Sequence, residues 1–324
     1  MEKTKAFYPG YAEGDLAPEV EAFLSSLASS GDDRPLSAMS PGEVRAACDI
    51  SPWTRRGDGG VSSEDLSIPG PGGRLALRLY RPQAPGPLPL LLWFHGGGWV
   101  FGSLNEADHL CAALAGRTPC LVASVDYRLA PEAPYPAALE DCGAALDWAF
   151  QEASNLGTEL GKIAVGGESA GANMAAVLCA QARDRAQPMP AFQLLVCPWT
   201  NLANLDSPSC RAFGDGPWLP RKNLDYYRAQ YLAAGANPLD PAISPALSPI
   251  FGGLPPAHVV TAEFDPLRDD GEAYADRLEA AGVTLSRRRY KGMIHSFIVL
   301  NRPLPAAETA LDDCAARLSE GFAR

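Results

Sequence analysis

A short apolar run that ends in a glycine-flanked serine constrains this chain more than any other stretch. In Ile163–Met174 the apolar residues lead into Gly167–Gly171 and then into Ala and Met residues at helical spacing. This order predicts a buried strand, a very tight turn and a helix. Glycine has no β-carbon, so Gly167 and Gly171 permit the close backbone approach that such a turn requires. Ser169 would stand exposed at the turn beside the free N–H groups of the helix, and we interpret it as a nucleophile.

The Gly-x-Ser-x-Gly pattern alone does not decide the point, because a serine can simply begin a helix after a buried strand. The deciding question is whether three further parts stand in the right order along the chain. These parts are a loop of backbone N–H donors before the serine, and an acid and then a histidine after it. All three are present, and each has a plainer alternative.

A glycine run stands before the serine, directly after the apolar segment Leu88–Phe94. Within His95–Trp99, three successive glycines leave the predicted strand, so that two backbone N–H groups could approach one oxygen. Acyl transfer passes through a negatively charged tetrahedral intermediate, which such donors stabilise. The alternative is a flexible glycine turn, but the position after a buried strand and ahead of the serine favours an oxyanion hole.

Of the four histidines, His295 is the one placed to act as a base. It follows the predicted strand Thr284–Tyr290 and comes late enough to complete the order serine, acid, histidine. His95 belongs to the glycine loop. His109 falls on an amphipathic helix as a surface or packing residue, and His258 begins a predicted core strand.

The acid should follow a strand between the serine and the histidine. Four carboxylates stand there, namely Glu263, Asp265, Asp269 and Asp270. Asp265 comes directly after the strand, and Pro266 fixes the loop behind it. A carboxylate at that point would hold the histidine tautomer and stabilise the imidazolium. The alternative for Asp265 is a plain helix N-cap before Pro266, whereas Asp269 and Asp270 fit a first helical turn.

Composition and charge exclude several classes of function. The 324 residues carry a formal net charge of −11, and the short run Arg287–Arg289 is too small a basic cluster for a nucleic-acid-binding surface. The eight cysteines include no CxxC pair, so we expect packing residues rather than disulfides or a metal site. The first ten residues contain no apolar leader and no later run is long enough to span a bilayer. We therefore expect a cytoplasmic protein without a membrane anchor.

Short apolar runs alternate with helical stretches along most of the chain. A hairpin of Val61–Ile68 and Arg74–Arg81 is expected first, followed by strands at Leu88–Phe94, Cys120–Val125, Lys162–Gly166, Phe192–Cys197 and His258–Thr261. Helices are expected at Asn105–Gly116, Ala137–Ala153 and Ala170–Arg183. This alternation predicts an α/β fold with a mainly parallel sheet covered by helices on both faces, and a site at the carboxyl ends of the strands.

Two segments fall outside this alternation, and we interpret both as parts of a cap over the site. Residues 1–50 contain helical pieces, one opening at Pro18 and one at the capping box Ser40–Glu43. Residues 198–254 form an insertion rich in proline and aromatic residues with one helix near Lys222–Ala233, and insertions of this length are usually functional. The core then consists of residues 51–197 and 255–324.

Five ordered motifs make the chain resemble the hormone-sensitive-lipase family of carboxylesterases, bacterial family IV included. The motifs are His95–Trp99, Asp126–Glu132, Gly167–Gly171, Asp265–Asp269 and His295–Phe297, and the resemblance covers nearly the whole chain. It implies an α/β-hydrolase fold with a helical cap. It also implies hydrolysis of esters with short to medium acyl chains through an acyl-enzyme, without a cofactor or metal.

The resemblance assigns site residues by matching positions. Three residues match the family's catalytic triad and three match its oxyanion-hole donors: Ser169, Asp265 and His295 for the triad, and Gly97, Gly98 and Ala170 for the hole. Many similar enzymes dimerise through the edge of the last strand, here Val283–Tyr290. The expected partners are therefore a small-molecule ester and a second copy of the chain.

Two carboxylates depart from the family pattern. Glu168 stands before the nucleophile, where Asp or Thr is more common, and we interpret it as a structural residue that pairs with a loop group at the elbow. Glu263 stands two residues before the expected acid, where a small residue is usual. A second carboxylate near Asp265 and His295 could raise the pKa of the histidine or shape the alcohol side of the pocket. We therefore hypothesise that Glu263 tunes the site.

Two other classes of protein share this scaffold. Plant hormone receptors that resemble the family have lost the histidine, and the presence of His295 argues against a pure binding module. Plant dehydratases similar to the family keep the triad yet eliminate water, so a lyase remains an open alternative.

The motif Asp126–Glu132 is interpreted as a loop pinned by an arginine–carboxylate pair rather than as a second site.

Overall fold

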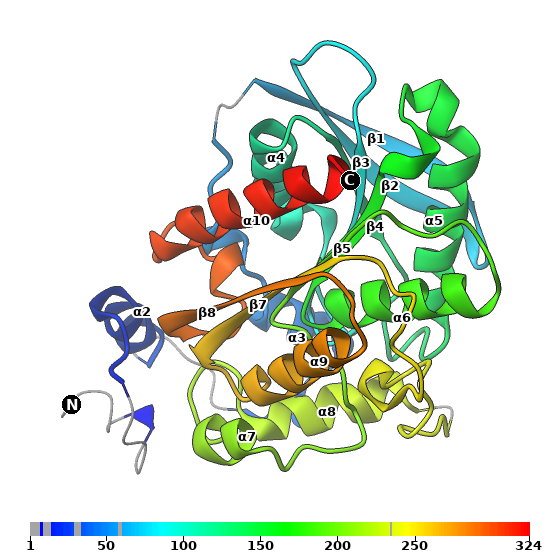
Figure 1. The fold of residues 1–324 in the computed structure, drawn as a ribbon. Coiled ribbons are helices and arrows are strands. Elements are labelled where there is room, and N and C mark those ends of the chain that lie inside the picture. Colours follow the sequence, from blue (N-terminus) through cyan, green and yellow to red (C-terminus); the bar gives the residue numbers. More distant parts are fainter. Residues whose placement is uncertain (1–6, 9–13, 29–33, 58–59, 234) are drawn as a thin grey trace.

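A single eight-stranded sheet organises the molecule (Figure 1). The computed structural model describes residues 7–8, 14–28, 34–57, 60–233 and 235–324. The strands are β1 Val61–Gly70, β2 Gly73–Pro82, β3 Leu90–Phe94, β4 Leu121–Asp126, β5 Ile163–Glu168, β6 Gln193–Val196, β7 Ala257–Phe264 and β8 Leu285–Ile294. Their order in the sheet is β1-β2-β4-β3-β5-β6-β7-β8. Strand β2 pairs antiparallel with β1 and β4 and the other pairs are parallel, which confirms the predicted mainly parallel sheet.

Helices cover both faces of this sheet. They are α2 Pro18–Ala28, α3 Pro41–Ala47, α4 Leu104–Arg117, α5 Ala137–Leu156, α6 Ala170–Asp184, α7 Pro208–Phe213, α8 Arg221–Tyr231, α9 Arg268–Ala280 and α10 Ala306–Phe322. Helices α4 and α10 pack on one face, and α5, α6 and α9 pack on the other (Figure 1). None of the helices within the described ranges is long and apolar enough to cross a lipid bilayer.

Strand β3 shows why both faces must be covered. Its five residues are all buried. Leu90, Leu92 and Phe94 belong to the core beneath α5, α6 and α9, whereas Leu91 and Trp93 belong to the core beneath α4 and α10. Because side chains alternate along a strand, an unbroken apolar run is stable only where helices pack on both sides.

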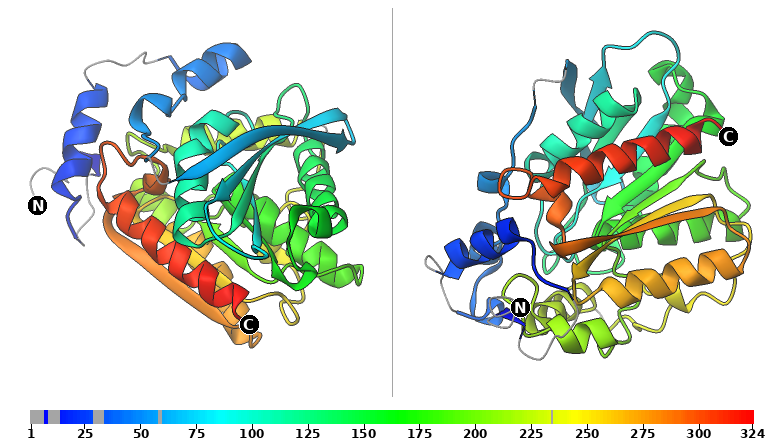
Figure 2. Two further views of the ribbon diagram at one scale, coloured as in Figure 1. Left: turned by 90° about the horizontal axis from the view of Figure 1, so that it is seen from above. Right: turned by 60° about the vertical axis from the view of Figure 1, so that its left-hand side comes forward.

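The N-terminal helices lie outside these layers, at the same end of the molecule as α7 (Figure 2). The predicted capping box opens α3: Glu43 N donates to Ser40 Oγ at 3.3 Å, and Ser40 N donates to Glu43 Oε2 at 2.8 Å. Ahead of α2, Ala17 N donates to Gly292 O at 3.1 Å, which ties the start of this helix to strand β8.

Helix α7 in the insertion was not predicted. It has six residues, too few to show a helical period in the sequence. Its start does carry a signal, because Ser207 Oγ accepts a hydrogen bond from Cys210 N at 3.1 Å and Pro208 occupies the first turn. The sequence therefore marked the start of α7 by its capping residues and not by apolar periodicity.

The turn between β5 and α6 brings backbone from distant strands into contact. A β-carbon on Gly171 would overlap the carbonyl oxygens of Phe94 and His95, and one on Gly167 would overlap the backbone of Gly171. Both positions therefore require glycine, for the reason that the sequence indicated.

Gly171→Ala should lower the free energy of unfolding by about 3 kcal/mol, because the new methyl group meets main chain that cannot move aside. Gly143→Ala in α5 is the matched control: its β-carbon meets only Leu178 Cδ2 at 3.6 Å, so this change should be neutral or stabilise by about 0.5–1 kcal/mol. Urea unfolding of both variants measures the difference. Equal effects would show that the elbow is not sterically restricted.

Candidate active site

Ser169 occupies the turn between β5 and α6 in a conformation that few residues with a side chain adopt. Its φ is 54° and its ψ is −114°. The backbone is fixed by a hydrogen bond from Ser169 N to Val196 O at 2.8 Å and by the glycine contacts around it. Strained conformations of this kind persist only where the surroundings hold them, and they are typical of functional sites.

Three side chains from three loops form one hydrogen-bonded chain. His295 Nε2 lies 3.0 Å from Ser169 Oγ, and His295 Nδ1 lies 2.8 Å from Asp265 Oδ2. The other carboxylate oxygen of Asp265 accepts a hydrogen bond from Leu267 N at 2.8 Å. All three side chains are buried. The structure thus brings together the three residues that matched the family's triad, and a proton can pass from the hydroxyl to the imidazole.

Buried carboxylates control the protonation of His295. Burial by itself lowers the pKa of His295, but the charges of Asp265 and then Glu168 outweigh it, so the pKa is raised above its usual value. Cys197 also lies here. Its Sγ is within 4.8 Å of a ring nitrogen of His295 and of a carboxylate oxygen of Asp265. Burial raises the pKa of Cys197, which therefore remains a thiol.

Cys197, Asp265 and His295 are the one cluster in the described part of the chain with spacing suited to a metal ion. Both ring nitrogens of His295 already have hydrogen-bond partners, and the thiol is protonated. Metal ligands must be deprotonated and free to bind. The hydrogen-bonded chain therefore accounts for this cluster without an ion.

The glycine loop after β3 lines the same cavity as Ser169. Gly97 and Gly98 have φ values of 106° and 58°. A β-carbon on Gly97 would overlap Phe101 O, and one on Gly98 would overlap the ring of Tyr227. Neither glycine N–H donates a hydrogen bond to another described residue, so both donors are available to an oxygen in the cavity.

The segment after β4 supports this loop. The Tyr127 hydroxyl donates to His95 O at 2.7 Å, and the two rings stack with centroids 4.2 Å apart. Arg128 donates to both oxygens of the buried Asp141 at 2.8 and 2.9 Å. The arginine–carboxylate pair expected for this motif is therefore present, with its carboxylate on α5. Tyr127 as the prop of the glycine loop was not predicted from the sequence.

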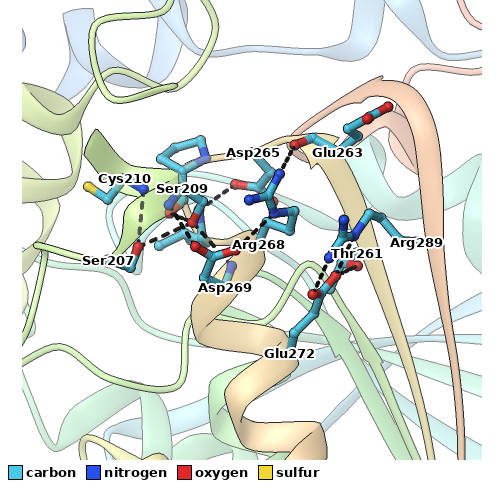
Figure 3. A network of polar contacts seen from close by, with 12 residues as sticks. Ser207, Ser209, Cys210, Thr261, Glu263, Asp265, Arg268, Asp269, Glu272 and Arg289 are labelled. Atoms are coloured by element: carbon cyan, nitrogen blue, oxygen red, sulfur yellow. Dashed lines mark hydrogen bonds and ion pairs between the residues drawn. The ribbon is translucent and has the colours of Figure 1, made fainter. Parts of the chain in front are cut away.

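The loop that carries Asp265 is clamped to the insertion (Figure 3). Asp269 Oδ2 accepts from Ser209 N at 2.7 Å, and Ser209 Oγ donates to Pro266 O at 2.9 Å. Arg268 Nε donates to Asp269 Oδ1 at 2.9 Å. The insertion is thus bonded directly to the segment that presents the acid.

Two further contacts tie the insertion to the core, and the sequence did not predict them. Asp270 accepts from Thr200 N at 2.6 Å, and Asn173 Nδ2 on α6 donates to Trp199 O and Ile243 O, each at 2.8 Å. Asp269 and Asp270 do lie in the first turn of α9, as expected, but their side chains face the insertion. A polar residue in the otherwise apolar first half of α6 was the available signal for Asn173.

The two unusual carboxylates lie in different surroundings. Glu263 Oε2 accepts from Gly292 N at 2.8 Å, and its carboxylate is directed away from Asp265 (Figure 3). Glu263 does not line the cavity at Ser169. Glu168 pairs with a loop group, as the sequence led us to expect, because its Oε1 accepts a hydrogen bond from the Ser296 hydroxyl. It also lines the cavity, and Glu168 Oε1 lies 3.6 Å from His295 Nε2.

A cavity of about 420 Å³ opens onto Ser169 and His295. Besides the glycine loop, its walls come from N-terminal residues between 27 and 53 and from insertion residues 217–227. Trp218 of the insertion donates from Nε1 to His295 O at 2.7 Å. Its ring also packs against Phe23 and Trp53, with centroids 5.4 and 6.1 Å away. Both segments expected to cap the site therefore contribute walls.

The fold and this geometry can be compared with known proteins. A family model described as alpha/beta hydrolase fold matches residues 91–299. Carboxylic ester hydrolase LipN of Mycobacterium tuberculosis is 43% identical over 263 residues, covering 79% of this chain and 69% of that protein. The chain belongs to the α/β-hydrolase fold family. Within it, this α/β-hydrolase is a carboxylic ester hydrolase of the hormone-sensitive-lipase group.

Two further relatives resemble this α/β-hydrolase over almost its full length. Ethyl acetate hydrolase of Pseudomonas putida is 35% identical over 306 residues, which are 91% of this chain and 96% of that protein. The structure of ester-hydrolase EH1AB1 from the metagenome of Lake Arreo superposes with a TM-score of 0.91 at 37% identity, covering 95% of this chain and all of that one. The resemblance seen in the sequence motifs is thus confirmed.

Glu263→Gln should leave the pH dependence of kcat/KM and the preference among esters unchanged, because Gln can still accept the Gly292 hydrogen bond and the side chain lies outside the cavity. Initial rates across pH on two esters of different acyl length measure both quantities. Asp265→Asn, which removes a carboxylate bonded to His295, serves as the positive control and should lower kcat by about 100-fold or more. A shifted pH profile in the Glu263 variant would support the tuning hypothesis instead.

Proposed function

We propose that this carboxylesterase hydrolyses esters of short to medium acyl chains through an acyl-enzyme on Ser169. In this proposal His295 is the general base and Asp265 orients it. The contact of 3.0 Å between His295 Nε2 and Ser169 Oγ carries the proposal, because a base must reach the proton that it removes. The oxyanion donors are the backbone N–H groups of three residues, namely Gly97, Gly98 and Ala170.

In the proposed reaction His295 accepts a proton and then donates it, once during acylation and once during deacylation. His295 Nε2 takes the hydroxyl proton as Ser169 Oγ attacks the ester carbonyl, and the negative charge on the carbonyl oxygen is stabilised by the N–H donors. The imidazolium then gives its proton to the departing alcohol oxygen, which leaves an ester on Ser169. His295 then removes a proton from a water molecule as the water attacks this ester, and it returns that proton to Ser169 Oγ as the acyl–oxygen bond breaks, which releases the acid and restores the free serine.

The size of the cavity supports a limited acyl length. At about 420 Å³ it lies toward the lower end of the range of roughly 300–1,000 Å³ typical of small-molecule pockets. The acyl and alcohol parts of the ester must both fit within this volume. The N-terminal segment and the insertion contribute its walls. A relative is an ethyl acetate hydrolase by name, which agrees with small esters.

A ladder of p-nitrophenyl esters from acetate to palmitate tests the proposal. We expect kcat/KM to peak at short or medium chains and to fall by at least about 100-fold at palmitate, because the long chain exceeds the cavity. Ser169→Ala should reduce turnover by about 1,000-fold or more while leaving the fold intact. Turnover that survives this substitution would contradict the assigned nucleophile.

The products separate hydrolysis from the lyase alternative. Hydrolysis releases one acid and one alcohol for each ester consumed, whereas elimination releases no such pair. Chromatography of the products of an alkyl ester therefore decides between them, and an unsaturated product without free acid would overturn the esterase mechanism.

The activity should also depend on pH with a definite sign. Only the neutral imidazole accepts a proton, so kcat/KM should fall as pH decreases through the pKa of His295. Because this pKa is raised, the acid limb should lie above about 6.5, the usual value of histidine. An acid limb below this value would contradict the electrostatics of the site.

We also propose that residues 1–50 and 198–254 together form the cap, since both supply walls of the cavity.

A homodimer through the edge of β8 remains a proposal. Within the described residues β7 is the only strand that pairs with β8, so no strand occupies the other edge of β8. Sedimentation of the purified protein measures the assembly state.

A further inference from the structure

Glu168 holds the turn that presents His295. It is the last residue of β5, and its carboxylate is buried. Oε1 accepts a hydrogen bond from the hydroxyl of Ser296, the residue after the histidine. Ser296 has a φ of 58°, a left-handed conformation that costs free energy for a residue with a side chain. A bond from β5 therefore stabilises this unfavourable turn.

The same carboxylate lies close to the reacting nitrogen. Glu168 Oε1 is 3.6 Å from His295 Nε2, on the side of the ring opposite the Asp265 contact. The other oxygen, Oε2, packs against Gly96, where even a β-carbon would not fit. The carboxylate thus lies between the glycine loop and the histidine.

Other titratable groups face this pair from several elements. Asp265 follows β7, Cys197 follows β6, and Glu106 lies on α4 and lines the same cavity. Burial raises the pKa of Glu106 to about 7, and the charge of Glu168 contributes to that rise. Tyr8 and Asp270 lie close enough to Asp265 for its charge to raise the pKa of each.

We propose that Glu168 is a positioning residue with a second, electrostatic action: through Ser296 it fixes the turn that aims the imidazole, and through its charge it stabilises the imidazolium formed when Ser169 attacks. The inference rests on the proposed function in taking His295 as the base. It assigns to Glu168 a role that neither its place in the sequence nor the elbow geometry requires.

The charge favours the transition state for a simple reason. An opposite charge within about 4–6 Å stabilises the protonated form of an imidazole, and the low dielectric of a buried site strengthens the effect. Burial raises the pKa of Glu168 itself, whereas His295 and Ser296 lower it, so the positive imidazolium favours the ionised carboxylate. The acid limb of the pH profile therefore belongs to His295, Asp265 and Glu168 together.

Two sets of variants separate the two actions. Glu168→Gln keeps an acceptor for Ser296 but removes the charge, and Glu168→Thr removes the charge with a shorter polar side chain. Ser296→Ala keeps the charge but removes the bond. Glu320→Gln on α10 removes an exposed carboxylate of the same kind and is the matched control. For each variant, kcat and KM are measured for p-nitrophenyl butyrate across pH at the isosbestic wavelength of the product.

Glu168→Gln should move the acid limb of kcat/KM down by about one pH unit and lower kcat about tenfold, with KM within about twofold. Glu168→Thr should move the limb in the same direction. Ser296→Ala should lower kcat about threefold to tenfold while the limb stays within about 0.3 unit of wild type. Glu320→Gln should change neither.

An acid limb that stays in place in both charge-free variants would overturn the electrostatic action. A wild-type kcat in Ser296→Ala would overturn the positioning action. A change confined to KM would assign Glu168 to substrate binding instead, and so overturn the proposal. Failure of the proposed function is recognised separately, because turnover would then survive Ser169→Ala in the wild-type background.

Discussion

The contact of Gly171 with the backbone at the end of β3 is the constraint on which the site depends. It forces the chain to leave β5 and enter α6 within one residue, and Ser169 takes the conformation that this requires. The same contact places the glycine loop after β3 beside the serine, so one steric condition positions both the nucleophile and the N–H donors. Any side chain at Gly171 would separate the two.

Buried charge is the second organising element. The site encloses Asp265, Glu168 and His295, and isolated charges in such surroundings would be strongly unfavourable. Each carboxylate is therefore satisfied: Asp265 by His295 and Leu267 N, and Glu168 by Ser296. Because both carboxylates face one imidazole, both stabilise the positive charge that forms on His295 during proton transfer.

The insertion is bonded directly to the segments that carry Asp265 and His295. Ser209 bonds to the loop that carries Asp265, and Trp218 donates to the carbonyl of His295. The insertion therefore contacts the segments of two proposed triad residues while it also forms the cavity wall. A change in the packing of the insertion should alter the position of these groups and also the length of acyl chain that the cavity accepts. Substrate range and rate would then change together.

The sequence by itself determined the succession of strands and helices along the chain, the covered sheet and the identity of Ser169, Asp265 and His295 as candidates. Apolar periodicity and glycine spacing are local properties that steric rules convert directly into strands, turns and helices. Only the tertiary structure decided which extra carboxylate faces the histidine. A register shift between Ala262 and Phe264 accompanies the turning of Glu263 toward Gly292, whereas burial against Gly96 directs Glu168 toward His295. Such directions depend on contacts between segments far apart in the chain, which no local pattern records.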